Sequence, residues 1–131
     1  MELTKKQFTY RGKTLDELKK LDVREFSKYL KSRQRRFVLR QFQKIEDFIN
    51  RSKAKIAKNK AVRTHSRNLI ITPEMVGMKI DVYNGRNFIR TEITGEMLGH
   101  KLGEFSPTRA RIKHGKAGVG ATKGTKSKSK K

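Results

Sequence analysis

The segment 78–93, MKIDVYNGRNFIRTEI, carries the pattern that decides the fold. Two runs of alternating apolar and polar residues flank Asn84 and Gly85. Asn-Gly is the preferred pair for a two-residue type I′ hairpin turn, because both positions need positive φ. A loop at these two positions predicts the cross-strand pairs Ile80 with Ile89, Val82 with Asn87, and Met78 with Thr91. One face of this hairpin is largely apolar, so we expect it to pack on a helix.

The chain before the hairpin predicts helices. Thr14 and Glu17 have the capping-box spacing, and Asp22 begins a second start signal, so two short helices are expected. A longer helix follows over about 35–55. Its predicted apolar stripe comprises Phe42, Ile45, Ile49 and Ile56, with Phe48 beside it. The opposite face carries Lys44, Arg51, Lys55 and Lys58.

Three further segments complete the predicted fold. Residues 56–67 lose the apolar pattern, which predicts an extended basic linker, whereas 68–71 form a short strand candidate that Pro73 ends. The composition after residue 108 is typical of disorder. We therefore predict an α+β fold, with N-terminal helices, a small antiparallel sheet of about three strands and a disordered basic C-terminal tail. The predicted organisation is a helical extension (1–33), an α+β core (34–108) and a basic flexible tail (109–131).

Net charge indicates the class of partner. Among 131 residues, 34 are Lys or Arg and 12 are Asp or Glu, which gives a formal net charge of +22. A polyanion relieves the self-repulsion of such a chain, and nucleic acid does so by releasing condensed counterions. A membrane surface fits less well, because the chain has no Trp and no long basic amphipathic helix with a broad aromatic face.

The sequence also indicates a compartment and argues against catalysis. It contains no Cys, no signal-peptide pattern at its start and no apolar run of membrane-spanning length, so we expect a cytoplasmic protein. His65, His100 and His114 lie far apart and lack companion carboxylates, so no metal site, cofactor or enzymatic activity is expected. Residues 12–14 have the ending of a phosphate-binding loop, but Gln7 occupies the position of its first glycine.

Arginine-rich clusters are the candidate binding residues. The first comprises Arg33, Arg35, Arg36 and Arg40, and the second comprises Arg63 and Arg67. A guanidinium matches phosphate oxygens and stacks on bases, so these clusters favour nucleic acid over a merely solvated face. Charge does not distinguish RNA from DNA, and a chromatin or nucleoid protein is the alternative that composition permits.

Several motifs make the chain recognisable. They are MVG at 75–77, VYNGR at 82–86, GHKLGEF at 99–105, PTR at 107–109, and SR at 66–67 before LII at 69–71 and Pro73. Over about 63–109 the chain closely resembles the small-subunit ribosomal protein S-nineteen family. Residues 1 to about 33 resemble the extended N-terminus of its archaeal and eukaryotic branch.

The resemblance implies a structural protein of the small ribosomal subunit. It implies binding to ribosomal RNA in the subunit head, a neighbouring S-thirteen family protein, and a C-terminal tail that runs toward the decoding region, near transfer RNA. The motif positions expected against RNA are Ser66, Arg67, Lys79, Arg86, His100, Lys101 and Arg109, and Arg111 and Lys113 extend this set into the tail. Replacing Arg67 and Arg109 by Ala is accordingly expected to weaken RNA assembly and leave fold stability nearly unchanged.

Overall fold

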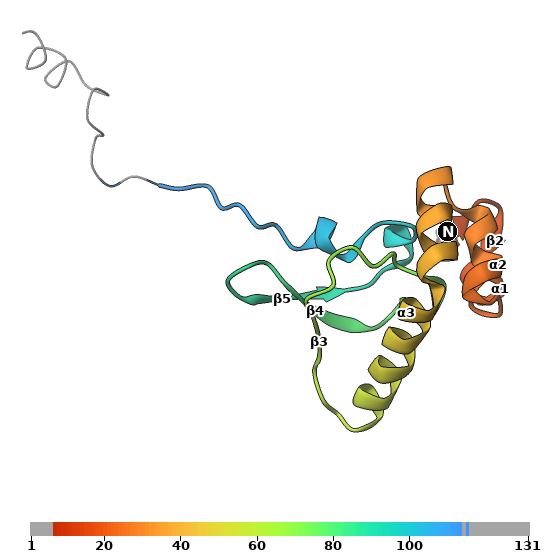
Figure 1. Cartoon of the computed structure of the whole chain (residues 1–131), viewed down its shortest axis with the longest axis horizontal. Helices are drawn as coiled ribbons and strands as arrows, with labels where there is room; N and C mark the ends of the chain where they lie inside the picture. The colour runs from red at the N-terminus through yellow and green to blue at the C-terminus, as the bar shows by residue number, and fades with distance from the viewer. Residues whose placement is uncertain (1–6, 114, 116–131) are drawn as a thin grey trace, which may run out of the picture.

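The computed structural model describes residues 7–113 and residue 115. A short hairpin of β1 (Thr9–Tyr10) and β2 (Lys13–Thr14) leads into α1 (Leu15–Lys19), α2 (Val23–Phe26) and the 3₁₀ turn η1 (Ser27–Tyr29). The long helix α3 (Ser32–Ala57) follows. Figure 1 shows the short N-terminal elements on one side of the first half of α3 and the strands on the other.

Local signals begin the two short helices, as predicted. The Thr14 hydroxyl accepts a hydrogen bond from the Glu17 amide, and the Glu17 carboxylate accepts one from the Thr14 amide. Asp22 forms the equivalent capping box with Glu25. These caps satisfy amides that the first helical turn leaves without partners.

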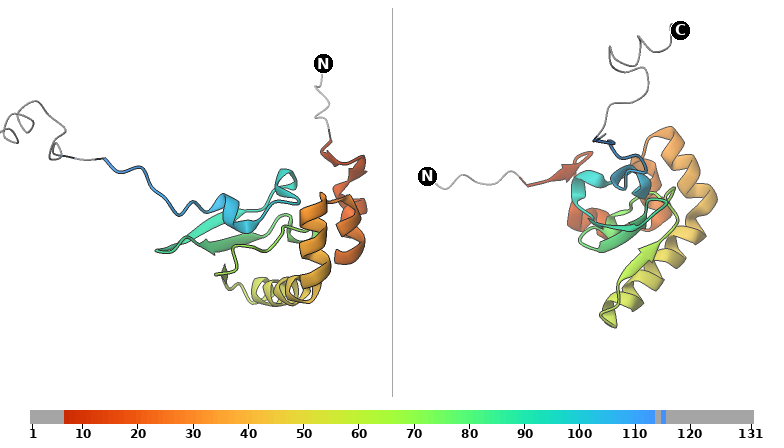
Figure 2. Two further views of the ribbon diagram at one scale, coloured as in Figure 1. Left: turned by 45° about the horizontal axis from the view of Figure 1, so that its top comes forward. Right: turned by 90° about the vertical axis from the view of Figure 1, so that its left-hand side faces the viewer.

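Helix α3 bends at Gln41, whose φ of −124° and ψ of 26° are not helical. Figure 2 shows that the two halves of α3 point in different directions. The guanidinium of Arg24 lies 3.7 Å from the ring centroid of Phe42 and so links α2 to α3. The predicted apolar stripe is correct at Ile45, Phe48 and Ile49, but Ile56 is 43% exposed because the helix end extends beyond the core.

The sheet has three strands in the order β3 (Val62–Thr64), β4 (Lys79–Tyr83), β5 (Phe88–Glu92). The predicted α+β class is confirmed, whereas two details of the sheet are wrong. Strand β3 comes from the segment predicted to be a linker, and it pairs in parallel with β4. The strand candidate 68–71 lies outside the sheet, where Ile70 makes an isolated antiparallel bridge to Lys101.

The hairpin forms at the predicted place in the chain, with a register two residues away from the predicted one. Ile80 pairs with Thr91, and Val82 pairs with Ile89. The turn is centred on Gly85 and Arg86, because the side-chain oxygen of Asn84 accepts hydrogen bonds from the amides of both Arg86 and Asn87. Gly85 alone of the two Asn-Gly residues has positive φ, at 97°. A shift of two residues keeps every side chain on its predicted face.

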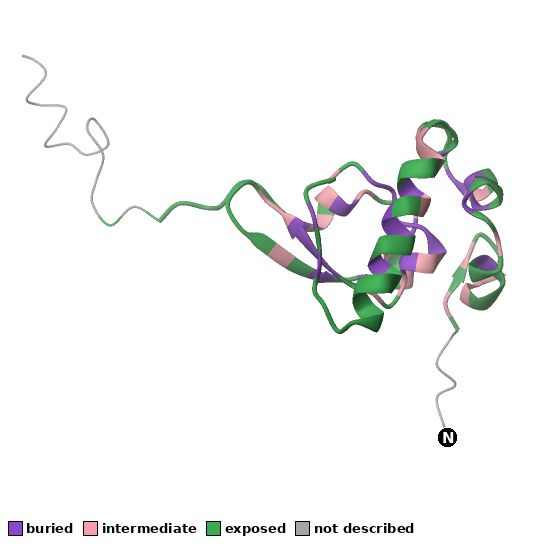
Figure 3. Cartoon of the chain, turned by 60° about the horizontal axis from the view of Figure 1, so that its bottom comes forward, coloured by how far each residue is buried: buried purple, intermediate pink, exposed green. Residues whose placement is uncertain are grey.

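One buried cluster joins all these elements. Its largest fully buried side chains include Phe26 and Leu18 from the short helices, Ile45 and Ile49 from α3, and Ile80 from β4. Figure 3 shows buried residues on α3, on the strands and on the short helices. Among the described residues, no helix has the length and apolarity that crossing a membrane requires.

The 3₁₀ turns η2 (Pro73–Met75), η3 (Gly95–Met97) and η4 (Leu102–Phe105) complete the core. The backbone of 69–71 exchanges hydrogen bonds with residues 99–102, which fixes the start of η4 beside this segment. After the buried Ser106 the chain leaves the body in an extended course (Figure 1). The sequence predicts that the tail is disordered over 109–131. Most of these residues, 114 and 116–131, lie outside the described part of the chain.

Candidate nucleic-acid interface

Three predicted arginines and one predicted lysine line a single hollow. Arg33, Arg36 and Arg40 recur at helical spacing on one face of the first half of α3, and Lys101 reaches the same hollow from 68 residues beyond Arg33 in the chain. The bridge between Ile70 and Lys101 brings this lysine to the helix. Two basic motifs that are distant in sequence therefore form one surface, the arginine hollow.

Arg35 belongs to the same sequence cluster and is exposed, but its guanidinium bonds within the protein. Its guanidinium donates hydrogen bonds to the backbone carbonyls of Ser27, Lys28 and Leu30, at 3.2, 2.9 and 3.2 Å. These carbonyls lie at the end of η1, where helical geometry supplies no further donors. Arg35 thus stabilises the junction between η1 and α3, and its predicted RNA contact stays a prediction.

Arg67 likewise bonds within the fold. It donates to the carbonyl oxygens of Tyr83 at 2.6 Å, Gly103 at 2.8 Å and Ser106 at 2.5 Å. One guanidinium therefore ties the end of β4 to η4 and to the start of the C-terminal segment. These bonds contradict the expectation that replacing Arg67 would leave fold stability nearly unchanged. The predicted RNA contact of Arg67 is a separate matter and stays a prediction.

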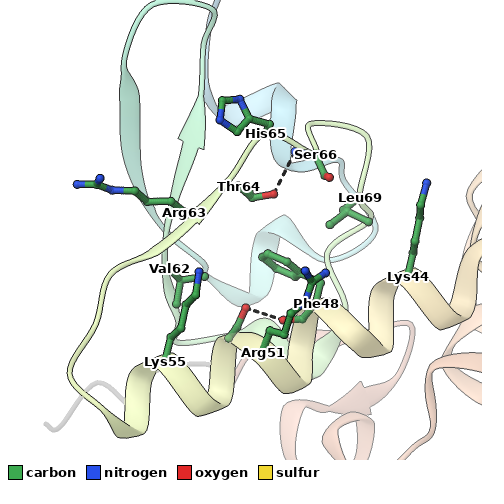
Figure 4. Close-up of a pocket in the computed structure, with 11 residues that line it drawn as sticks. Lys44, Phe48, Arg51, Lys55, Val62, Arg63, Thr64, His65, Ser66 and Leu69 are labelled. Atoms are coloured by element: carbon green, nitrogen blue, oxygen red, sulfur yellow. Dashed lines mark hydrogen bonds between the residues drawn. The ribbon is translucent and has the colours of Figure 1, made fainter.

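A second basic hollow, the α3–β3 groove, lies between the helix and the edge strand. Lys44, Arg51 and Lys55 from α3 line it together with Arg63 and Ser66 at β3. Figure 4 shows Lys44, Arg51 and Lys55 projecting from α3 on the groove side. Arg63 points away from them, on the other side of β3. The sequence pattern puts Lys44, Arg51 and Lys55 on the polar helix face, but the predicted site residues do not include them. These residues could have been assigned to a site only if the segment that forms β3 had been predicted to be a strand.

The outer face of the sheet carries two rows of side chains. In the first row Asp81 accepts a hydrogen bond from Arg90 at 3.0 Å, and Arg63 lies 3.9 Å from its other oxygen. Asp81 is 7% exposed, so these two cations compensate a carboxylate that is largely removed from water. In the second row the rings of His65, Tyr83 and Phe88 pack together.

The remaining predicted residues lie apart on the surface. Lys79 begins β4, Arg86 occupies the hairpin turn, and both are exposed. The His100 ring nitrogen Nδ1 lies 2.6 Å from Glu104, whose other carboxylate oxygen accepts a hydrogen bond from the Lys101 amide. This carboxylate orients His100 at the start of η4. The exposed C-terminal segment carries Arg109, Arg111 and Lys113.

Side chains that would bind a metal ion do not gather in the described part of the chain, where no group of three or more His, Asp or Glu residues has a suitable arrangement. Cations dominate the surfaces above, and their planar guanidinium groups suit phosphate oxygens. The arrangement is that of a rigid basic body suited to binding a folded polyanion.

Comparison with known proteins identifies the family. The family model described as Ribosomal protein S19 matches residues 24–114. The small ribosomal subunit protein uS19 of Methanococcoides burtonii is 43% identical over 122 residues, covering 93% of this chain and 88% of that protein. Its counterpart in Methanocella arvoryzae is 46% identical over 123 residues, covering 93% and 86%. A match over this much of the chain leaves one assignment: the protein belongs to the ribosomal protein S19 family.

Proposed function

We propose that this chain is a structural constituent of the small ribosomal subunit, on cytoplasmic ribosomes, and that it binds the subunit's RNA without catalysing a reaction. The observation that carries the proposal is the arginine hollow, where separate predicted motifs converge on one surface. The two relatives described above are named small ribosomal subunit proteins. Their names favour a ribosomal function over a chromatin or nucleoid role.

We assign two surfaces to the RNA backbone. The arginine hollow and the α3–β3 groove both present several cations from rigid elements, so they neutralise phosphates without first having to order a loop. The proposed RNA-contacting residues outside these hollows are Lys79, Arg86, His100, Arg109, Arg111 and Lys113. Ser66 contributes a hydroxyl at the edge of the groove.

The double variant Arg36→Ala/Arg40→Ala tests the first surface. We expect it to bind a transcript of the small-subunit RNA head domain more weakly than the parent. The slope of log binding constant against log salt concentration should fall by about 1 for each phosphate that the variant no longer neutralises. Filter binding over a range of salt concentrations around the physiological value measures both quantities.

The matched control is Lys19→Ala/Lys20→Ala, which removes the same charge from the exposed end of α1. An equal weakening in both double variants would mean that only net charge matters and would contradict a specific surface. Duplex DNA as competitor tests the alternative function. If it displaces the chain as effectively as the RNA transcript does, the general nucleic-acid binder becomes the better description.

We further propose, from the family resemblance, that the chain lies in the subunit head beside an S-thirteen family protein and that its tail runs toward the decoding region and transfer RNA. Residues 109–113 extend away from the body, as a tail that reaches a distant RNA site would have to do (Figure 1). The chain has no Cys, so Lys113→Cys provides a single attachment site for an iron chelate.

In assembled subunits, radicals from the chelate should cleave decoding-region RNA and bound transfer RNA. A thiol-reactive cross-linker at the same site should capture the S-thirteen protein. The matched control, Lys20→Cys, places the probe on α1 and should give a different cleavage pattern. Cleavage from Lys113→Cys confined to RNA remote from the decoding region would contradict the proposed course.

A further inference from the structure

An aromatic cluster lies on the outer sheet face, next to the α3–β3 groove that His65 also lines. We define the aromatic platform as His65, Tyr83 and Phe88. The ring centroids are 4.4 Å apart between His65 and Tyr83, 5.1 Å between Tyr83 and Phe88, and 5.2 Å between His65 and Phe88. Tyr83 and Phe88 are cross-strand partners, and His65 directly follows β3.

This cluster is not part of the core. Strand side chains alternate, so Val82 and Ile80 turn toward α3 while Tyr83 turns outward. Phe88 is 36% exposed, His65 is exposed, and neither belongs to the buried cluster or to the partly buried residues packed on it. Three rings on one open sheet face expose apolar surface to water, which is unfavourable in free energy. A partner stacked on the rings would remove that surface from water.

Cations flank the platform. The Arg63 guanidinium lies 5.4 Å from the centroid of the Phe88 ring, and Arg86 extends from the hairpin turn next to this strand pair. The Tyr83 hydroxyl donates a hydrogen bond to the Gly85 carbonyl, which ties its ring to the turn. The platform therefore combines aromatic rings with one positive charge on β3 and another at the hairpin turn.

We propose that the aromatic platform binds one unpaired RNA base by stacking, while Arg63 and Arg86 bind the phosphates next to it. An unpaired base exposes a π face that aromatic side chains cover, whereas bases inside a duplex already stack on each other. The flanking cations favour a nucleotide over an apolar protein segment. This inference rests on the proposed RNA-binding function and adds a different mode of contact to it.

Two substitutions of Phe88 test the proposal in the full-length chain. The chain contains no Trp, so Phe88→Trp introduces a single indole fluorophore on the platform. Its emission should be quenched when the head-domain transcript binds and unchanged by a fully paired RNA duplex. Phe88→Ala should bind the transcript roughly 5- to 150-fold more weakly, which is the range of base-aromatic stacking, with an unchanged salt slope.

The matched fluorescence control is Ile56→Trp, at the exposed end of α3, whose emission should stay unquenched. Melting temperatures establish that the Phe88 variants fold. If the parent binds the transcript while Phe88→Ala binds equally well and Phe88→Trp is not quenched, the platform inference alone fails. If the parent does not bind the transcript, the proposed function fails and the inference with it. Quenching by the S-thirteen protein in place of RNA would also overturn it.

Discussion

Replacing Arg67 by Ala should lower the free energy of unfolding by at least about 3 kcal/mol, because three backbone carbonyls are deprived of a charged donor together. The three acceptors are the carbonyl oxygens of Tyr83, Gly103 and Ser106. The Ser106 hydroxyl also donates to the Val82 carbonyl, and the Gly103 amide donates to the Arg67 carbonyl. These contacts would remain, but without the guanidinium the end of β4 and η4 should loosen together. Urea unfolding of parent and variant gives the difference directly.

Arg67→Lys is the informative companion to this variant. A single ammonium group cannot reproduce the fork that reaches three carbonyls, so it should recover less than half of the missing stability. The matched control is Arg86→Ala, an exposed arginine in the hairpin turn. It should change the unfolding free energy by no more than about 1 kcal/mol. An Arg67→Ala variant as stable as this control would show that water replaces the guanidinium without cost.

The close contact with Arg67 also explains why a glycine occupies position 103. A Cβ atom at Gly103 would lie 2.9 Å from the Arg67 Cβ and 3.0 Å from its carbonyl oxygen. That carbonyl accepts the Gly103 amide at 2.8 Å, so the two backbones approach as closely as a hydrogen bond requires. The GHKLGEF motif and the SR motif therefore fit together inside the protein, in addition to any role against RNA.

Local chemistry explains which elements the sequence predicted. The capping boxes at Thr14 and Asp22 and the alternation along 78–93 each depend on residues a few positions apart, and the structure contains all three. Strand β3 is only three residues long and pairs in parallel with a strand that begins 17 positions after its first residue. Its stability comes from that tertiary pairing, so no periodic pattern of its own indicates it.

The turn register shows a similar limit. The Asn-Gly pattern predicts positive φ at Asn84 within the loop. In the structure the Asn84 side chain instead accepts hydrogen bonds from two backbone amides, and Gly85 and Arg86 form the centre of the turn. Asn favours both arrangements, and a sequence pattern does not distinguish them. The candidate site likewise combines features that the sequence shows with features that only the fold shows. Arginine clusters are visible in the sequence, whereas the bonds that Arg35 and Arg67 make within the protein depend on carbonyls that only the folded chain supplies.

Phe26→Ala should destabilise the protein by about 3–5 kcal/mol, the usual cost of removing a large aromatic side chain from a core. Phe26 is fully buried, and its ring centroid lies 6.1 Å from that of Tyr10 in the N-terminal hairpin. It joins the same buried cluster as Ile45 and Ile80. The cavity left by its side chain would lie between the short helices and α3.

This variant also tests the predicted division at residue 33. Because the buried cluster is continuous from Leu18 to Leu102, we expect one cooperative unfolding transition in which far-ultraviolet signal and core amide protection disappear together. The control is Leu39→Ala, a 49% exposed position on α3 that should cost no more than about 0.5 kcal/mol. If Phe26→Ala abolished protection only before residue 33 while β4 and β5 stayed protected, the N-terminal segment would be a separately folding extension. A shared loss of protection instead means that the extension stabilises the body from which α3 presents its arginines to RNA.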